Sequence, residues 1–198
     1  MKAAAQKKQR FEKEALIHLD VIFSAALKMT GNRMEAEDLV QETLLRAFRF
    51  FDKFRSGTNC KAWLFKIMTN LYINRYNRQK SLPGVTSYDD VEDFYFYNKV
   101  NSTDYIANSD FSANWIFTNL LDDDVRNLLQ ELPESFRITV VLCDIQGFSY
   151  EEVARIMSVK IGTVKSRLFR ARRKLQKGLH EWARTNGYLP KGILHGAA

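Results

Sequence analysis

The clearest structural signals lie in SYEEVARIMSVKIGTVKSRLFRARRKLQK, which runs from Ser149 to Lys177. Ser149, followed three residues later by Glu152, forms a capping box and predicts that a helix begins here. A short turn over 158–161 leads to a second helix, whose apolar residues recur at spacings of four, three and four. These residues are Val164, Leu168, Ala171 and Leu175. Two short helices joined by a tight turn predict a helix-turn-helix.

The remaining faces of the second helix are strongly basic, which favours DNA as the ligand. The N-terminal part of such a helix enters the major groove, so Lys165, Ser166 and Arg167 should lie nearest the bases. Phe169 suits a thymine methyl, and Arg170 suits a guanine or a phosphate. Further contacts to phosphate are expected from Thr163, in the first helical turn, and from Arg172 and Arg173 toward the far end of the helix. Basic amphipathic helices also occur in membrane-surface and calmodulin-binding segments, but the capped helix and the turn before this one favour DNA.

Charge divides the 198-residue chain into three blocks. Residues 1–80 hold 16 basic and 8 acidic side chains, residues 81–135 hold 2 and 11, and residues 136–198 hold 12 and 4. The net charge of +7 indicates an anionic partner, nucleic acid or an acidic membrane face. No apolar run is long enough to predict a membrane span, and no apolar segment typical of a secretory signal follows the N-terminal lysines. We therefore expect a protein of the cytoplasm.

Helical periodicity extends over both basic blocks and predicts an all-α fold. In the first block we expect helices over 11–29, over 33–51 after a cap at Asn32, and over 61–80, with Gly31 ending the first of them. Two small helical domains are predicted, one of three to four helices at 11–82 and the helix-turn-helix domain at 122–180. They are joined by an acidic linker at 83–121, which contains many aromatic residues and which we expect to dock on a surface, and they are followed by a tail at 181–198.

The predicted helix over 61–80 carries two stripes. Trp63, Ile67 and Leu71 form the apolar one, and a polar stripe of Lys66, Asn70, Asn74 and Asn77 lies about 100° away. Asparagine weakens a helix, so its repetition on one face suggests contacts to bases or to sugar-phosphate, although a solvated face explains it as well. Aromatic and cationic residues near the loop at 55–60 suit an unstacked single strand. For Phe48, Phe51 and Trp63 a place in the core is the favoured interpretation.

Motifs in both blocks resemble those of sigma-70-type factors. The stretches DLVQET (38–43), RAF (46–48), KAWLFKI (61–67) and Asn70 resemble conserved region 2. LPE (132–134), GFSYEEVA (147–154) and GTVKSRLFRAR (162–172) resemble region 4. The order, the spacing and the missing regions 1.1 and 3 resemble the extracytoplasmic-function (group 4) sigma factors. GTNCKAWL (57–64) and YDDVED (88–93) resemble the branch that answers thiol-oxidative stress and is held by zinc-containing anti-sigma proteins.

This resemblance implies roles for individual residues. Contacts to the clamp helices of core RNA polymerase are implied for Asp38, Gln41, Glu42 and Arg46, and the polymerase flap is a further expected contact. The melted −10 strand is implied to bind Phe54, Arg55, Asn59, Lys61, Lys66, Asn70 and Asn74. The −35 duplex is implied to bind Lys165, Ser166, Phe169 and Arg170. Many members have arginine at position 165, and a lysine there gives a point charge in place of a fork. The acidic linker is implied to thread toward the basic polymerase cleft.

Three classes of function compete at this point. The first is a promoter-recognition subunit of RNA polymerase, and the second is a helix-turn-helix regulator that acts without polymerase. The third, an enzyme such as a nuclease, is rejected because His18, His180 and His195 lack metal-ligand spacing and because Asp122–Asp124 is better explained as the start of a helix. We expect no catalytic residue, no metal and no cofactor. Cys60 and Cys143 are interpreted as two reduced thiols, with a redox-reactive Cys60 as the alternative.

Overall fold

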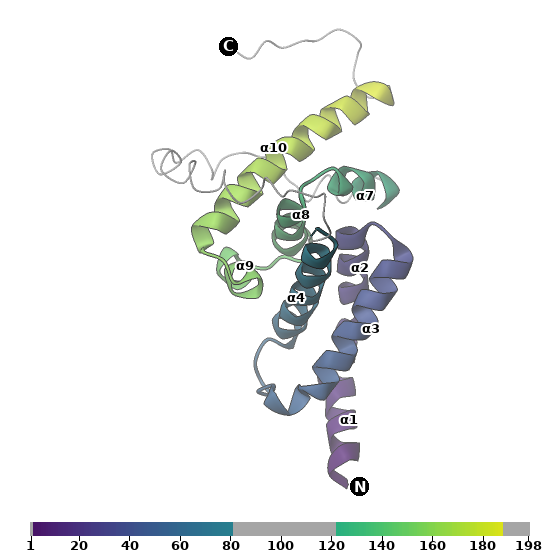
Figure 1. The fold of residues 1–198 in the computed structure, drawn as a ribbon, viewed down its shortest axis with the longest axis vertical. Helices are drawn as coiled ribbons and strands as arrows, with labels where there is room; N and C mark the ends of the chain where they lie inside the picture. The colour runs from purple at the N-terminus through teal and green to yellow at the C-terminus, as the bar shows by residue number, and fades with distance from the viewer. Residues whose placement is uncertain (1, 81–121, 188–198) are drawn as a thin grey trace.

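Every regular element in residues 2–80 and 122–187, the parts of the chain that the computed structural model describes, is helical (Figure 1). The first part contains α1 (Lys2–Glu14), α2 (Leu19–Thr30), α3 (Arg33–Arg49) and α4 (Cys60–Lys80), with 3₁₀ turns at Leu16–His18 and Phe51–Lys53. The second contains α7 (Asp122–Gln130), α8 (Glu134–Val140), a π-helical turn (Val141–Ile145), α9 (Tyr150–Met157) and α10 (Ile161–Thr185). The all-α prediction is confirmed. The predicted linker at 83–121 and residues 188–198 of the predicted tail lie outside the described residues.

The boundary between α2 and α3 follows the prediction. Gly31 has a φ of +71°, a left-handed conformation suited to glycine, and its N–H donates to the Leu27 carbonyl. The Asn32 side chain then accepts hydrogen bonds from the backbone N–H groups of Met34 (2.9 Å) and Glu35 (3.2 Å). This cap satisfies two N–H groups that have no partner within the helix, and it fixes where α3 begins.

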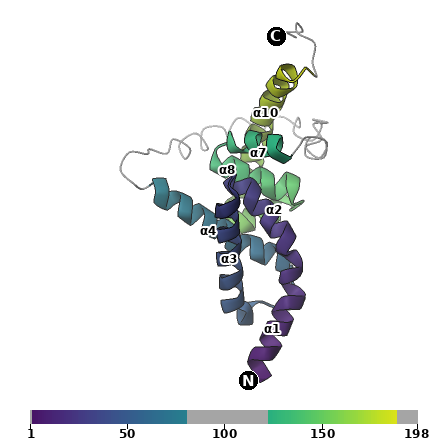
Figure 2. The ribbon, with the colours of Figure 1, turned by 90° about the vertical axis from the view of Figure 1, so that its right-hand side faces the viewer.

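The start of the chain differs from the prediction, because the expected helix over 11–29 is two helices. A 3₁₀ turn after Ala15 separates α1 from α2, and α1 begins at Lys2. Residues 2–10 contain no large apolar side chain, so periodicity gave no sign of a helix there, although alanine, lysine, glutamine and arginine all favour helix. Figures 1 and 2 show α1 extending beyond the rest of the bundle at one end.

The helix-turn-helix forms as predicted at α9 and α10. Ser149 Oγ accepts from the Glu152 N–H (3.2 Å), and Glu152 Oε2 accepts from the Ser149 N–H (3.0 Å), which completes the capping box. Ser158 ends α9 with a φ of 57°. Along α10 the predicted apolar stripe of Val164, Leu168, Ala171 and Leu175 is buried. The helix continues past the predicted end near 177 to Thr185.

The two parts of the chain pack against each other along a seam in which α4 lies between α3 and α9 (Figure 1). The rings of Phe65 on α4 and Phe148, just before α9, meet edge to face with centroids 5.0 Å apart. Because α4 is covered on two sides, its buried residues are not confined to the predicted stripe, of which Leu71 is buried. Leu64, Phe65 and Met68 are fully buried, whereas Trp63 and Ile67 of that stripe are only partly so.

Candidate nucleic-acid interface

The surface of α10 presents the residues expected to read duplex DNA. Lys165 and Arg173 are exposed, and Phe169 is 46% exposed although it is a large aromatic residue. An exposed phenylalanine on a helix that buries its own apolar stripe is available for a ligand. The remaining predicted contacts, Thr163, Ser166, Arg167 and Arg170, are half-buried. In the first turn the Ser166 hydroxyl donates to the Thr163 carbonyl (3.1 Å), so these two residues are held together.

Arg172, which the sequence suggested as a phosphate contact, has a structural partner instead. Its Nη2 and Nε donate to the two carboxylate oxygens of Asp144, at 2.6 and 3.1 Å. Only 5% of the Asp144 side chain is exposed, so this forked ion pair is nearly dry on the carboxylate side. The hydrogen bond that Arg172 donates to Asp144 raises the pKa of Arg172. This pair joins α10 to the π-helical turn, and the interpretation of Arg172 as a phosphate contact is corrected.

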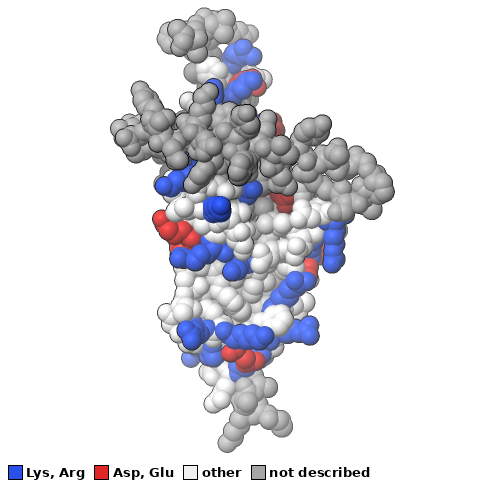
Figure 3. All heavy atoms as spheres, turned by 60° about the vertical axis from the view of Figure 1, so that its left-hand side comes forward, with Lys and Arg blue, Asp and Glu red and all other residues white. Residues whose placement is uncertain are grey.

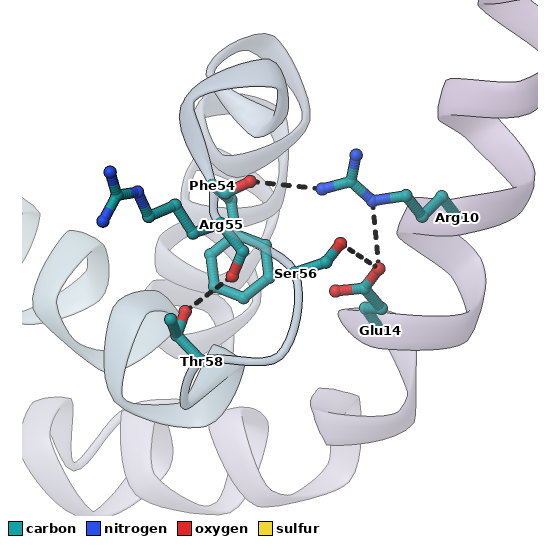
Figure 4. A network of polar contacts seen from close by, with 6 residues as sticks. All are labelled: Arg10, Glu14, Phe54, Arg55, Ser56 and Thr58. Atoms are coloured by element: carbon teal, nitrogen blue, oxygen red, sulfur yellow. Dashed lines mark hydrogen bonds and ion pairs between the residues drawn. The ribbon is translucent and has the colours of Figure 1, made fainter.

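The loop before α4 presents charge while burying its aromatic residue. The Phe54 ring, a predicted −10 contact, is 7% exposed and packs on Phe51 and Trp63 with centroids 5.7 and 5.0 Å away, so it belongs to the core. Arg55 is exposed, and its side chain points away from α1 in Figure 4. Its carbonyl accepts from the Thr58 hydroxyl (2.7 Å), which closes the turn. Gly57, with a φ of +84°, sits at the tip.

The polar stripe of α4 faces solvent. All four of its members, Lys66, Asn70, Asn74 and Asn77, are exposed. The first of them, Lys66, lies between one and two helical turns after α4 begins at Cys60, on the same part of the chain as the loop. Figure 3 shows groups of Lys and Arg side chains, with few acidic ones between them, on the side of the molecule that carries α9. Such a surface attracts a phosphate backbone.

The start of α4 meets the second part of the chain. Asn59 Nδ2 donates to Glu152 Oε1 (3.1 Å), and Lys61 Nζ donates to the Gln146 carbonyl (2.8 Å). The Lys61 amine also lies over the Phe148 ring, 4.8 Å from its centroid. Burial lowers the pKa of Lys61. Two predicted −10 contacts, Asn59 and Lys61, therefore bind the helix-turn-helix part in this structure. Sequence periodicity could not predict these contacts, because it reports on one helix at a time.

The outer face of α3 holds the residues expected to contact polymerase. Asp38, Gln41 and Arg46 are exposed, and Glu42 pairs with Arg46 (2.8 Å) and with Arg75 of α4 (2.6 Å). The hydrogen bond from Arg75 lowers the pKa of Glu42. The sequence reading missed two apolar members of this face, Met34 and Leu45, which are 77% and 71% exposed. Their spacing of four, three and four from Met34 through Asp38 and Gln41 to Leu45 was the available signal.

The environment of each cysteine thiol disfavours the thiolate. Burial raises the pKa of the Cys60 thiol to about 11 and that of the Cys143 thiol to about 12, so both are neutral near pH 7. A redox-reactive Cys60 is therefore not favoured. Within residues 2–80 and 122–187 no three His, Cys, Asp or Glu side chains come together in a way that could hold a metal ion. No helix among the same residues is long and apolar enough to cross a membrane.

Known proteins share both halves of this arrangement. Residues 16–82 match the family described as Sigma-70 region 2, and residues 122–175 match Sigma-70, region 4. The ECF RNA polymerase sigma factor EcfG of Rhodopseudomonas palustris is 35% identical over 155 residues, which cover 78% of this chain and 77% of that protein. The ECF RNA polymerase sigma factor SigE of Mycolicibacterium smegmatis is 35% identical over 80% of this chain, which spans only 57% of SigE.

A solved structure has the same arrangement of helices. The sigma factor RpoE from Bartonella quintana, crystallised in complex with the anti-sigma factor NepR, superposes with a TM-score of 0.64 at 31% identity. The match covers 87% of this chain and 98% of the RpoE chain.

Proposed function

We propose that this chain, which belongs to the sigma-70 family as an extracytoplasmic-function (ECF) RNA polymerase sigma factor, binds core polymerase and directs it to promoters by reading two separate DNA elements. The observation that carries the proposal is that one chain has two surfaces suited to DNA, one on the part that matches region 2 and one on the part that matches region 4. One is a helix-turn-helix at α9 and α10, and the other is a basic loop with a polar stripe at α4. We further propose that the chain acts in the cytoplasm and has no catalysis of its own.

We propose that α10 reads the −35 element as duplex. Lys165 and Phe169 supply the exposed base contacts, while Arg167, Arg170 and Arg173 supply positive charge along the groove. Thr163 and Ser166 hold the first turn, whose N–H groups can bind a phosphate. Arg172 takes no part, because Asp144 engages it.

The −10 element is proposed to bind as a melted strand along α4. The exposed side chains of this surface are two cations, Arg55 in the loop and Lys66 on the helix, and two amides, Asn70 and Asn74. Cations suit the sugar-phosphate backbone, and amides suit base edges. Phe54 contributes by supporting the loop from the core. Asn59 and Lys61 join this surface only after their bonds to Glu152 and Gln146 break, so their part in strand capture requires the seam to open.

The outer face of α3 is the proposed polymerase contact. Exposed Met34 and Leu45 flanked by Asp38 and Gln41 form an amphipathic strip of the kind that binds a partner helix, in keeping with the clamp helices. An anti-sigma factor is a further proposed partner, supported by the likeness to RpoE in its complex with NepR.

Run-off transcription on a randomised promoter library tests the proposed function. The chain, mixed with core polymerase, should select templates that share two conserved elements, and core polymerase alone should select none. Footprinting of the same templates by the chain without polymerase addresses the alternative of a stand-alone regulator. A strong footprint without polymerase, together with no run-off product in its presence, would establish the regulator and refute the sigma factor.

A further inference from the structure

Helix α1 lies outside the residues that match the sigma-70 family, yet it packs against the segment that leads into the −10 loop. The region 2 match begins at residue 16, whereas α1 covers Lys2–Glu14. Phe11 of α1 is 6% exposed, and its ring meets Phe48 and Phe51 edge to face with centroids 5.2 and 5.1 Å away. These contacts anchor α1 to the end of α3 and to the turn that follows it.

Polar contacts from α1 reach further, into the loop itself (Figure 4). Arg10 Nη2 donates to the Phe54 carbonyl (3.2 Å), and the Ser56 hydroxyl donates to Glu14 Oε1 (3.0 Å). Arg10 Nε donates to the same Glu14 oxygen (3.0 Å), so the two α1 side chains act as one unit. The Arg10 guanidinium also lies over the Phe51 ring, 4.6 Å from its centroid.

The positions of these contacts decide what they do. They hold the residues on either side of Arg55, whose own side chain points away from α1 (Figure 4). On the far side of the turn, Thr58 is bonded to the Arg55 carbonyl (2.7 Å). The loop backbone is thus fixed on both sides of Arg55, the cation that the loop presents to solvent. A guanidinium that is already held in place loses less entropy on binding.

We infer that α1 is a brace for the −10 loop, and that Arg10 and Glu14 are positioning residues which set its base preference without touching DNA. The inference rests on the proposed function, because it takes the loop as part of the −10 surface. A second point of attachment supports the same role. Lys7 Nζ pairs with Asp52 (2.5 Å) and reaches the Arg49 carbonyl (3.5 Å), so α1 contacts the turn before the loop as well.

The test replaces Glu14 with alanine and compares it with Glu12→Ala as a matched control. Both residues lie on α1, but Glu12 only approaches Lys8 of the same helix (4.0 Å). Glu14→Ala removes a carboxylate that is unfavourable near the helix C-terminus but also loses the i,i+4 pair with Arg10; both effects are small and they oppose each other, so α1 should persist. Ser56→Ala removes the same bond from the loop side. Each variant is assembled with core polymerase and run on a template library randomised in the −10 element behind a −35 element selected by the wild type.

Two ratios are measured. The −10 ratio compares transcripts from templates with preferred and non-preferred −10 bases, and the −35 ratio makes the same comparison for the −35 element. Ser56→Ala should lower the −10 ratio roughly three- to tenfold, the equivalent of one hydrogen bond, and Glu14→Ala, which also removes the bond from Arg10, should lower it at least as much. They should leave the −35 ratio unchanged, and Glu12→Ala should change neither. The double variant should lose no more than the larger single loss, since one bond is removed twice.

Two results would overturn the brace. One is a wild-type −10 ratio in both Glu14→Ala and Ser56→Ala. The other is an equal fall in the −10 and −35 ratios, which indicates a general loss of folded protein. Failure of the proposed function looks different, because the wild-type holoenzyme itself would then show no −10 preference, and the brace would fall with it.

Discussion

Replacing Gln130 with alanine should open the seam between the two parts of the chain. Gln130 ends α7, and its Nε2 donates to the Lys28 carbonyl in the last turn of α2 (3.1 Å). Its side chain also fills the space over Gly31, where even an added Cβ would lie 2.5 Å from the Gln130 Cδ. On its other side Gln130 Oε1 accepts from the Arg137 guanidinium. None of these residues belongs to the proposed DNA surfaces.

The expected magnitude follows from the two bonds that Gln130 makes. Losing the bond to Lys28 costs about 1 kcal/mol. Arg137 is 7% exposed and its Nε already has no partner among the described residues, so the loss of its Gln130 acceptor costs about 1–2 kcal/mol more while the seam is closed. Opening hydrates the guanidinium and relieves that cost. A total of about 2–3 kcal/mol raises the ratio of open to closed protein roughly 30- to 150-fold.

Small-angle X-ray scattering of the full chain measures the opening. The radius of gyration of Gln130→Ala should exceed that of the wild type, and an exposed glutamine of α10, Gln176, provides the matched control as Gln176→Ala. Circular dichroism should show the same helical content in all three proteins. Equal radii in Gln130→Ala and the wild type, at equal helical content, would refute the account of the seam.

Three further perturbations follow from individual contacts. Asp144→Asn should lower the free energy of unfolding by about 2–3 kcal/mol in urea denaturation, because Arg172 loses a nearly dry ionic partner; a change under about 0.5 kcal/mol would contradict this. Leu45→Glu, at a site 71% exposed, should change stability by less than about 0.5 kcal/mol yet weaken core polymerase binding at least about tenfold in a competition assay, and unchanged affinity would remove α3 from the interface. Burial raises the thiol pKa of Cys60 to about 11 and that of Cys143 to about 12, whereas the unfolded chain releases these protons at lower pH. The free energy of unfolding should therefore keep its full thiol contribution below pH 9 and decline above pH 9. A double alanine variant whose free energy of unfolding declines equally between pH 9 and 10.5 would count against this cause.

Local signals in the sequence were sufficient for the elements that have their own caps and stripes. Asn32 and Ser149 begin α3 and α9 where their hydrogen-bonding patterns require, and the stripe of α10 from Val164 to Leu175 is buried as its spacing indicates. In these elements the residues that decide the structure are close neighbours in the chain. The helix-turn-helix and its exposed basic face could therefore be predicted from a single stretch.

Contacts between distant residues account for what the sequence did not reveal. The burial of Phe65 depends on Phe148, and the bonds of Asn59 and Lys61 depend on Glu152 and Gln146, more than 80 residues away along the chain. The apolar stripe of a single helix predicts one buried face, so it could not predict that α4 is buried on a second face. The extent of α1 was missed for a related reason, since its first nine residues carry no apolar stripe.

Aromatic residues illustrate the same limit at the candidate site. Phe54 and Phe169 both stand next to basic residues in the sequence, and both were predicted to contact DNA. The structure separates them, because Phe54 is 7% exposed inside an aromatic cluster and Phe169 is 46% exposed on α10. Only the surrounding tertiary packing distinguishes a ring that supports a loop from one that is free to meet a base.

Site-specific photocrosslinking in the assembled holoenzyme tests whether the two proposed DNA surfaces bind two different promoter elements. A photoreactive amino acid replaces Arg55 in one protein and Lys165 in another, and each is bound with core polymerase to a promoter selected from the library. The probe at position 55 should crosslink to the non-template strand of the melted −10 element, and the probe at position 165 should crosslink to duplex DNA at the −35 element. Crosslinks from both positions to the same element, or an unchanged pattern when core polymerase is omitted, would contradict it.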